Sequence, residues 1–369
     1  MQKAHSRTHQ GWMRRASRIY LDKTVNRGKL DSLTSFLNTY KQAEQYAIVR
    51  FWSTHDFSST LSGKEVTKSI EERFGFTARL SQCVAKQSRE CVRSQKERRE
   101  RMPRIRKSVA ALDSRFVTIE QFGGSFDMCL KFGSGVPKMT VPFNWNKHTD
   151  RLRSNGWELS RSIRLCHDGK DLFVDLIFEK QKPPTRTEGD VVGIDRGARA
   201  MLYTSKGQEV GTELWSVIKA AGKRRNAYHH FIETEENRLL KTLPFTGVRT
   251  FVLERLKHVK RGRGAGRSRK RSRQSNRLLS FWHYARVGTR LMQRCEEAGV
   301  SINFKDPWKT SQHCPVCGNI DRRNRSGKRF RCLKCGHTDD ADHIGAVNLE
   351  LLGLAGVYSL RSLKSENMA

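Results

Sequence analysis

No apolar run in this sequence is long enough to cross a membrane. The most apolar long segment, residues 345–360, is interrupted by Asn348 and Glu350 and is shorter than the roughly 20 residues that a membrane-spanning helix needs. The basic N-terminal residues 1–15 lack the apolar core of a signal peptide. We therefore expect a soluble, cytoplasmic protein with no membrane partner.

Acidic residues are also scarce. The 369 residues include 37 Asp and Glu against 71 Lys and Arg, which gives a formal net charge of +34. A chain with this charge repels itself unless a polyanion neutralises it. The basic residues run along the whole chain, which favours nucleic acid as the partner. A ribosomal or chromatin protein has a similar balance but is usually shorter and needs no spaced carboxylates.

Cysteines form a pattern in only one region. Five of the nine are scattered, which is typical of free thiols in a reducing compartment: Cys83, Cys91, Cys129, Cys166 and Cys295. The other four form two Cys-x2-Cys pairs, Cys314 with Cys317 and Cys332 with Cys335. Pairs at this spacing predict one tetrahedral, structural Zn²⁺ site. A redox dithiol or a coincidence does not explain why the two pairs match.

The N-terminal half predicts a small β-barrel interrupted by helices. Residues 18–21 form a short strand pattern, and helical apolar spacing occurs at residues 30–52 and 78–101. Residues 104–185 contain five short strand patterns separated by Gly, Pro, Asn and Asp, at 116–119, 126–132, 139–143, 159–165 and 172–178. We expect residues 1–28 and 104–185 to build the barrel, with residues 29–103 as a helical insertion.

A second domain is expected after a polar linker at residues 180–189. One apolar strand pattern ends in Asp195 and another ends in Glu254. Further strands are predicted at 200–204 and 300–304, and helices at 213–240, 276–298 and 341–352. An Arg-, Gly- and Ser-rich stretch, residues 260–273, is too charged to pack and is expected to stay mobile until it meets phosphate.

Three carboxylates from separate elements form a candidate site: Asp195, Glu254 and one of Asp339, Asp340 or Asp342. The first two end apolar strands, where burial of an uncompensated charge costs several kcal/mol. Shared divalent cations remove that cost, and two Mg²⁺ ions about 4 Å apart are a common arrangement for phosphodiester hydrolysis. The alternative is that Asp195 begins a turn and Glu254 makes a surface ion pair.

Four segments of the C-terminal half resemble TnpB transposon proteins. Residues 192–197 and 252–256 resemble the first two RuvC-like motifs, and residues 309–318 match the segment that leads into the zinc ribbon of that family. Residues 342–348 resemble the third motif, which selects Asp342 as the third acid. The family usually has Asn and Ala where this chain has Ile344 and Gly345.

The resemblance implies an RNA-guided DNA endonuclease of a transposon, related to the type V CRISPR effectors. Its implied partners are a guide RNA from the transposon end and double-stranded target DNA beside a short flanking motif, bound by one or two copies of the protein in a prokaryotic nucleoid. The implied fold is α+β and multidomain. An RNase H-like RuvC domain would comprise residues 186–308 and 339–369, with the zinc ribbon inserted at residues 309–338.

The same resemblance implies a Mg²⁺-dependent enzyme in which Asp195, Glu254 and Asp342 are both catalytic residues and ligands of two Mg²⁺ ions. A guide-dependent repressor that does not cut DNA is one alternative, although this chain retains all three acids. A guide-independent RuvC-like or RNase H-like nuclease is another. A CRISPR effector is a third, and the compact length favours the transposon type.

Overall fold

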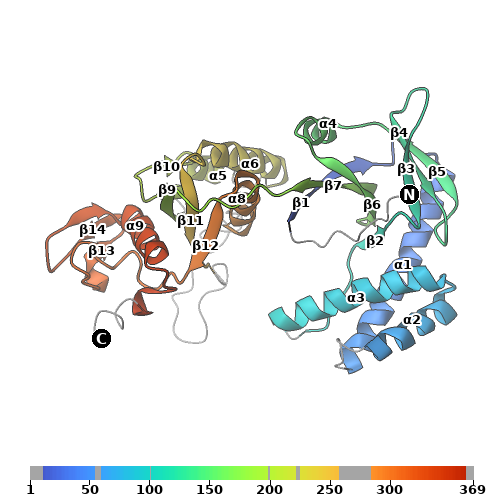
Figure 1. Ribbon diagram of the computed structural model, residues 1–369, viewed down its shortest axis with the longest axis horizontal. Coiled ribbons are helices and arrows are strands. Elements are labelled where there is room, and N and C mark those ends of the chain that lie inside the picture. The colour runs from blue at the N-terminus through green and yellow to red at the C-terminus, as the bar shows by residue number, and fades with distance from the viewer. Residues whose placement is uncertain are drawn as a thin grey trace. The chain divides into compact units, whose positions relative to one another are not determined.

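The computed structural model describes residues 11–54, 60–99, 101–197, 200–221, 225–256 and 284–362. The chain divides into two compact units, Met1–Gln181 and Lys182–Ala369, which Figure 1 colours from blue to red along the chain. No helix within the described part of the chain has the length and apolar character to cross a membrane. The basic stretch at residues 260–273 lies outside the described residues.

Three helices follow the first strand of the N-terminal unit: α1 (Arg27–Thr54), α2 (Thr60–Phe74) and α3 (Ala78–Arg99). The helices predicted at 30–52 and 78–101 are confirmed by α1 and α3. Helix α2 was not predicted, because its apolar face is a single narrow line of Val66, Ile70 and Phe74 in a polar sequence. The faces of all three helices pack into the core that the unit's strands share.

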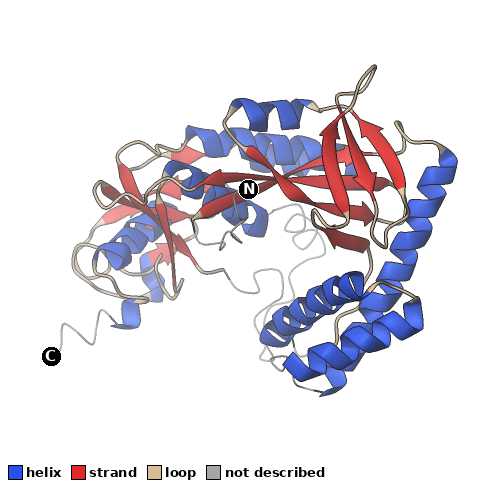
Figure 2. Ribbon diagram, turned by 45° about the vertical axis from the view of Figure 1, so that its right-hand side comes forward, coloured by secondary structure: helices blue, strands red, loops and turns tan. Residues whose placement is uncertain are grey.

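Seven strands complete the N-terminal unit: β1 (Trp12–Tyr20), β2 (Ser108–Leu112), β3 (Val117–Gln121), β4 (Met128–Phe132), β5 (Met139–Phe143), β6 (Glu158–His167) and β7 (Leu172–Gln181). Helix α4 (Lys147–Ser154) precedes β6. The predicted pairing of the first strand with the later sheet is confirmed, since β1 runs antiparallel to β7 along its whole length. Figure 2 separates these strands (red) from the helices (blue).

These strands form two sheets rather than the closed barrel that the sequence predicted. The orders are β1-β7-β6-β2 and β3-β4-β5, all antiparallel, and no hydrogen-bonded pairing closes them into a ring among the described residues. Among the described residues, strand β5 pairs only with β4, and it contains Pro142, which has no N–H to donate. Proline within a sheet is typical of such an edge strand.

A five-stranded mixed sheet is the centre of the C-terminal unit: β8 (Asp190–Asp195), β9 (Leu202–Thr204), β10 (Glu209–Val210), β11 (Val248–Glu254) and β12 (Ser301–Lys305). The order is β10-β9-β8-β11-β12, and β8, β11 and β12 are parallel. The predicted strands that end in Asp195 and Glu254 are confirmed as β8 and β11. Because they are parallel neighbours, their two terminal acids lie at the same edge of the sheet.

Helices cover both faces of this sheet. Val192, Ile194, Phe251 and Leu253 pack into a core shared with α5 (Leu214–Ala221), α6 (Arg225–Leu239) and α8 (Tyr284–Ala298). On the other face, Val191 and Val252 pack against Leu349 of α9 (Ala341–Leu354). The helix predicted at 213–240 is thus seen as α5 and α6, and residues 276–283 of the predicted 276–298 helix lie outside the described part.

Helix α9 packs very closely on β8, and a glycine makes this possible. A Cβ on Gly193 would lie 2.6 Å from the amide nitrogen of Glu350 and even closer to the carbonyl oxygen of Ala346. Only a residue without a side chain permits this approach between two backbones. The close packing fixes the position of the first turn of α9 relative to the carboxyl end of β8.

Candidate metal centre and acid pocket

The four predicted zinc ligands meet in one cluster. Their Sγ atoms all lie within 4.8 Å of one another. Cys314 and Cys335 are 3.6 Å apart, and Cys317 and Cys332 are 3.5 Å apart. Thiolates on a tetrahedral Zn²⁺, with Zn–S of about 2.3 Å, are separated by roughly 3.8 Å. The donor set and its dimensions therefore fit zinc.

Each pair of cysteines sits on a tight turn. The amide of Gly318 donates to the carbonyl of Cys314 and that of Gly336 to the carbonyl of Cys332, both at 3.0 Å. Both glycines have a positive φ, +69° and +75°, which side chains disfavour. Burial raises the pKa of the Cys332 thiol, but the backbone amides of Cys335 and Lys334 outweigh burial and lower this pKa to about 6.

The region that contains both cysteine pairs, residues 309–338, is here called the cysteine ribbon. It contains β13 (Arg325–Ser326) and β14 (Arg329–Arg331), and β15 (Thr338–Asp340) adds a third strand in the order β13-β14-β15. Asp340 then caps α9, because its side chain accepts a hydrogen bond of 2.7 Å from the amide of Asp342. The ribbon is thereby joined directly to α9.

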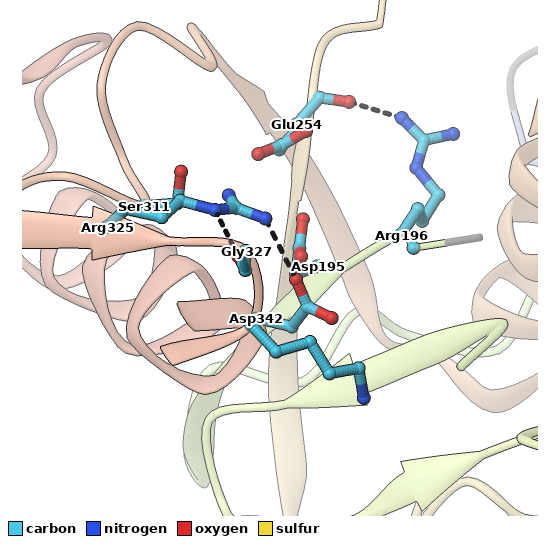
Figure 3. Close-up of a pocket in the computed structure, with 9 residues that line it drawn as sticks. Asp195, Arg196, Glu254, Ser311, Arg325, Gly327 and Asp342 are labelled. Carbon is cyan, nitrogen blue, oxygen red and sulfur yellow. Dashed lines mark hydrogen bonds and ion pairs between the residues drawn. The ribbon is translucent and has the colours of Figure 1, made fainter. Parts of the chain in front are cut away.

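The three predicted acids line one cavity of about 380 Å³, which we call the acid pocket. Asp195 ends β8, Glu254 ends β11 and Asp342 stands in the first turn of α9, so the three come from separate elements (Figure 3). The full lining is Asp195, Arg196, Gly197, Glu254, Ser311, Arg325, Gly327, Lys328 and Asp342.

The structure separates the roles of the three candidate aspartates near the start of α9. Asp340 is the helix cap described above, and Asp339 lies 2.8 Å from Nδ1 of His343 through its Oδ2. Neither of them lines the acid pocket, whereas Asp342 does. The geometry therefore places Asp342 beside the other two acids.

The acid pocket disfavours the ionised forms of Asp195 and Glu254 when no metal cation is bound. Burial, and then the charges of Glu254 and Asp342, raise the pKa of Asp195 well above its usual value. Burial also raises the pKa of Glu254, although the charge of Arg196 and a hydrogen bond from Thr310 oppose this shift. Bound cations would remove the repulsion, and oxygen donors suit a hard cation such as Mg²⁺.

The acids are less tightly grouped than the cysteines. Within the described ranges, only the four cysteines bring three or more possible ligand atoms within 4.8 Å of one another. The three carboxylates line the same cavity without forming such a compact group.

Several pocket residues were not predicted from the sequence. Arg196 donates to the carbonyl oxygen of Glu254, Thr310 donates to Oε1 of Glu254 at 3.2 Å, and Arg325 donates to Asp342. Thr310 lies in the segment that resembles the approach to a zinc ribbon, which offered a signal. Nothing in the sequence distinguishes Arg325 from the other basic residues.

Comparison with known proteins identifies the C-terminal unit's relatives. The family model "Cas12f1-like, TNB domain" matches residues 284–349. A CRISPR-associated endodeoxyribonuclease Cas12f1 of Sulfoacidibacillus thermotolerans is 39% identical over 77 residues, which are 21% of this chain and 18% of that protein. A TnpB-like protein of Aquifex aeolicus is 32% identical over 107 residues, 28% of this chain and 33% of that protein. Over the matched residues, the chain is similar to Cas12f1 and TnpB-like proteins.

The sequence matches span less than two-thirds of the length of either TnpB/Cas12f-like relative. A solved structure extends the comparison to most of the chain: the cryo-EM structure of the Cas12f1-sgRNA-target DNA complex covers 86% of this chain and 81% of its own, with a TM-score of 0.55 and 13% identity. At that identity the similarity is one of fold. It supports the α+β, multidomain fold that the sequence predicted.

Proposed function

We propose that this chain is an RNA-guided DNA endonuclease whose acid pocket hydrolyses phosphodiester bonds. The observation that carries the proposal is that Asp195, Glu254 and Asp342, which are far apart in the sequence, line one cavity together with Arg325 and Lys328. Relatives named as endodeoxyribonucleases, and a similar fold solved with guide RNA and target DNA, support the same function.

The acids and the basic side chains have complementary tasks in this proposal. Asp195, Glu254 and Asp342 would hold two Mg²⁺ ions, which would polarise the phosphate and activate a water. Arg325 and Lys328 attract the DNA phosphate into the pocket and stabilise its developing negative charge. Arg196 holds the end of β11 beside the end of β8 through the Glu254 carbonyl.

The cysteine ribbon has a structural task. Its four thiolates would hold Zn²⁺, and this binding would stabilise the fold of residues 309–338, in which Arg325 and Lys328 line the pocket wall. We infer an RNase H-like RuvC domain in residues 186–308 and 339–369 around this ribbon. In the N-terminal unit, the two sheets of residues 1–28 and 104–185 would form a wedge-like part, and residues 29–103 a helical recognition insertion.

The basic composition suits the proposed partners. A guide RNA reads the target by base pairing, while the net charge of +34 lets the protein hold the phosphate backbones of both nucleic acids. We propose that the RNA comes from a transposon end, that the target is nucleoid DNA beside a short flanking motif, and that one or two copies of the chain bind each RNA.

The proposal is tested by comparing Asp195→Asn with Asp190→Asn. Asp190 is an exposed acid at the other end of the same strand, so its replacement is a matched control. RNA that copurifies with the chain is sequenced, a matching plasmid target is built, and binding and Mg²⁺-dependent cleavage are measured. We expect Asp195→Asn to lower cleavage by more than about 100-fold, beyond the effect of outer-shell partners, while RNA and target binding persist.

Other outcomes favour the alternatives. Guided binding without any cleavage by the wild-type protein would indicate a repressor. Cleavage of branched or hybrid substrates by protein free of RNA would indicate a guide-independent RuvC-like or RNase H-like nuclease. If Asp195→Asn cleaves as fast as Asp190→Asn, the acid pocket is not the nuclease site.

A further inference from the structure

The carboxylate of Glu254 is contacted by a hydroxyl from the cysteine ribbon. Oγ1 of Thr310 lies 3.2 Å from Oε1 of Glu254 and 3.4 Å from the carbonyl oxygen of Pro307. One hydroxyl proton serves these two acceptors, and the charged carboxylate is the stronger one. Thr310 is only 2% exposed, so water competes little for this hydrogen bond.

A buried amide holds Thr310 in place. Nδ2 of Asn348, in α9, donates to the carbonyl of Thr310 at 2.7 Å and to the carbonyl of His313 at 2.9 Å. The Oδ1 of Asn348 lies 2.5 Å from Nδ1 of His313. Asn348 is fully buried, and breaking such a satisfied set of hydrogen bonds would leave buried polar groups without partners. Residues 310–313 are therefore anchored to the helix that carries Asp342.

The backbone before Thr310 is also constrained. Lys309 has φ of +56°, in the left-handed region that side chains other than Gly, Asn and Asp rarely adopt. Its carbonyl accepts hydrogen bonds from the amides of Gln312 and His313, at 2.9 and 3.1 Å. Such a conformation persists when the surrounding contacts determine it, and here it directs the Thr310 side chain toward Glu254.

We propose that Thr310 is a positioning residue that orients Glu254, and that Asn348 fixes Thr310 for this task. This inference rests on the proposed metal-dependent function of the acid pocket. The hydroxyl engages Oε1 of Glu254, so the orientation of the whole carboxylate toward a cation is set. Since His313 directly precedes the zinc ligand Cys314, the same contacts couple the folding of the ribbon to the geometry of the acid pocket.

A matched pair of variants tests the hydroxyl. Thr310→Val keeps the shape and removes the hydroxyl, whereas Thr310→Ser keeps the hydroxyl and removes the methyl group. Both retain the backbone carbonyl that Asn348 holds, so the ribbon stays anchored. If thermal unfolding shows that Thr310→Val does not fold, Thr310→Ala is used in its place.

Two measurements are made on the RNA-bound protein. Mn²⁺ binding is followed by electron paramagnetic resonance, with Asp195→Asn as the reference that subtracts ions held by RNA. Single-turnover cleavage and the Kd for target DNA are measured in parallel. We expect Thr310→Val to weaken Mn²⁺ binding and slow cleavage by about 10- to 100-fold, as outer-shell partners of metal ligands do. The target Kd should be unchanged and Thr310→Ser should resemble wild type.

Each result separates this proposal from the proposed function. An Asp195-dependent Mn²⁺ site that Thr310→Val leaves unchanged overturns the positioning role alone, and so does a Thr310→Ser variant as impaired as Thr310→Val. The absence of an Asp195-dependent Mn²⁺ site overturns both proposals. If the wild-type protein binds Mn²⁺ but does not cut DNA, and Thr310→Val weakens that binding, the positioning role is supported and the nuclease function is rejected.

Discussion

Arg325 of the cysteine ribbon donates a hydrogen bond to Asp342 of α9, with 3.4 Å between Nη2 and Oδ1 (Figure 3). Its Nε also donates to the carbonyl of Gly327 at 3.0 Å, which fixes the direction of the guanidinium. A side chain of the ribbon thus reaches an acid of the sheet-and-helix pocket. The positive charge of Arg325 therefore lies beside the acids of the acid pocket and interacts with them directly.

Replacement of Arg325 should damage cleavage more than binding. We expect Arg325→Gln to slow cleavage by about 10- to 100-fold, because the DNA phosphate loses a fixed cation and Asp342 loses its partner. Arg325→Lys should recover only part of the rate, since an ammonium lacks the planar fork of a guanidinium. Arg323→Gln, which removes an exposed arginine paired with Asp321, is the control. Equal rates for Arg325→Gln and Arg323→Gln would contradict this role.

Removal of zinc should unfold the ribbon. The apparent free energy of binding of structural zinc in small domains is about 10–16 kcal/mol. Chelation or Cys332→Ser should therefore lower the melting temperature and expose the remaining thiols. Because Arg325 and Lys328 lie on the ribbon, cleavage should fall further than RNA binding. Metal content, thiol titration and thermal unfolding measure these effects, with Cys91→Ser, a half-buried thiol elsewhere, as the control. An unchanged melting curve after complete zinc removal would rule out the tetrathiolate site.

Two glycines at the same helix–strand contact should respond differently to alanine. Gly193→Ala would drive a methyl group into the backbone of α9, so we expect a loss of several kcal/mol or failure to fold. Gly345→Ala places its Cβ 3.4 Å from Cγ of Asp195, an ordinary contact, and should be tolerated. Thermal unfolding and soluble yield compare the two. A stable, wild-type-like Gly193→Ala protein would disprove the close packing of α9 on β8.

Glu44 should make the stability of the N-terminal unit depend on pH. Burial raises the pKa of this α1 residue from 4.5 to about 7, although a hydrogen bond from Gln87 opposes the shift. The folded state therefore holds a proton that the unfolded state releases above pH 4.5. The stabilisation is complete below pH 4.5 and is lost as the pH rises through 7, by up to about 3 kcal/mol.

Glu44→Gln should remove this dependence, because Gln is neutral and its Oε1 can still accept from Gln87. Relative to wild type, the variant should be similar in stability at pH 4.5 and more stable at pH 8 in denaturant unfolding. Glu72→Gln, at an exposed acid near Lys68 on α2, is the control. Parallel pH profiles for wild type and Glu44→Gln would show that Glu44 is ionised in the folded state.

Much of the acid pocket was predictable because its acids end buried strands. Parallel strands covered on both faces are continuous apolar runs, so Asp195 and Glu254 stand out as the first charges after such runs. The spacing of the two Cys-x2-Cys pairs likewise predicts the four ligands of the zinc site. The choice of Asp342 over Asp339 needed the family resemblance, since only the folded structure gives Asp339 its own partner, His343.

Other features depend on contacts that no local pattern encodes. Strand β2, with the sequence Ser-Val-Ala-Ala-Leu, carries little strand preference and forms because β6 lies beside it. The strand patterns also did not reveal that these strands form two separate sheets. Thr310 and Arg325 acquire their partners only when the ribbon meets α9 and the sheet. Such tertiary hydrogen bonds were beyond what residue spacing could predict.

The packing of α9 on β8 has a consequence for synthesis. Asp342 and the helix that covers Val191 and Val252 follow Asp195 and Glu254 along the chain and are therefore synthesised after them. A product of premature termination before Ala341 would keep Asp195 and Glu254 but lack the third acid and leave one side of the sheet bare. Under the proposed function, a chain shortened in this way could still hold nucleic acid but would lack a complete set of acids for cutting it.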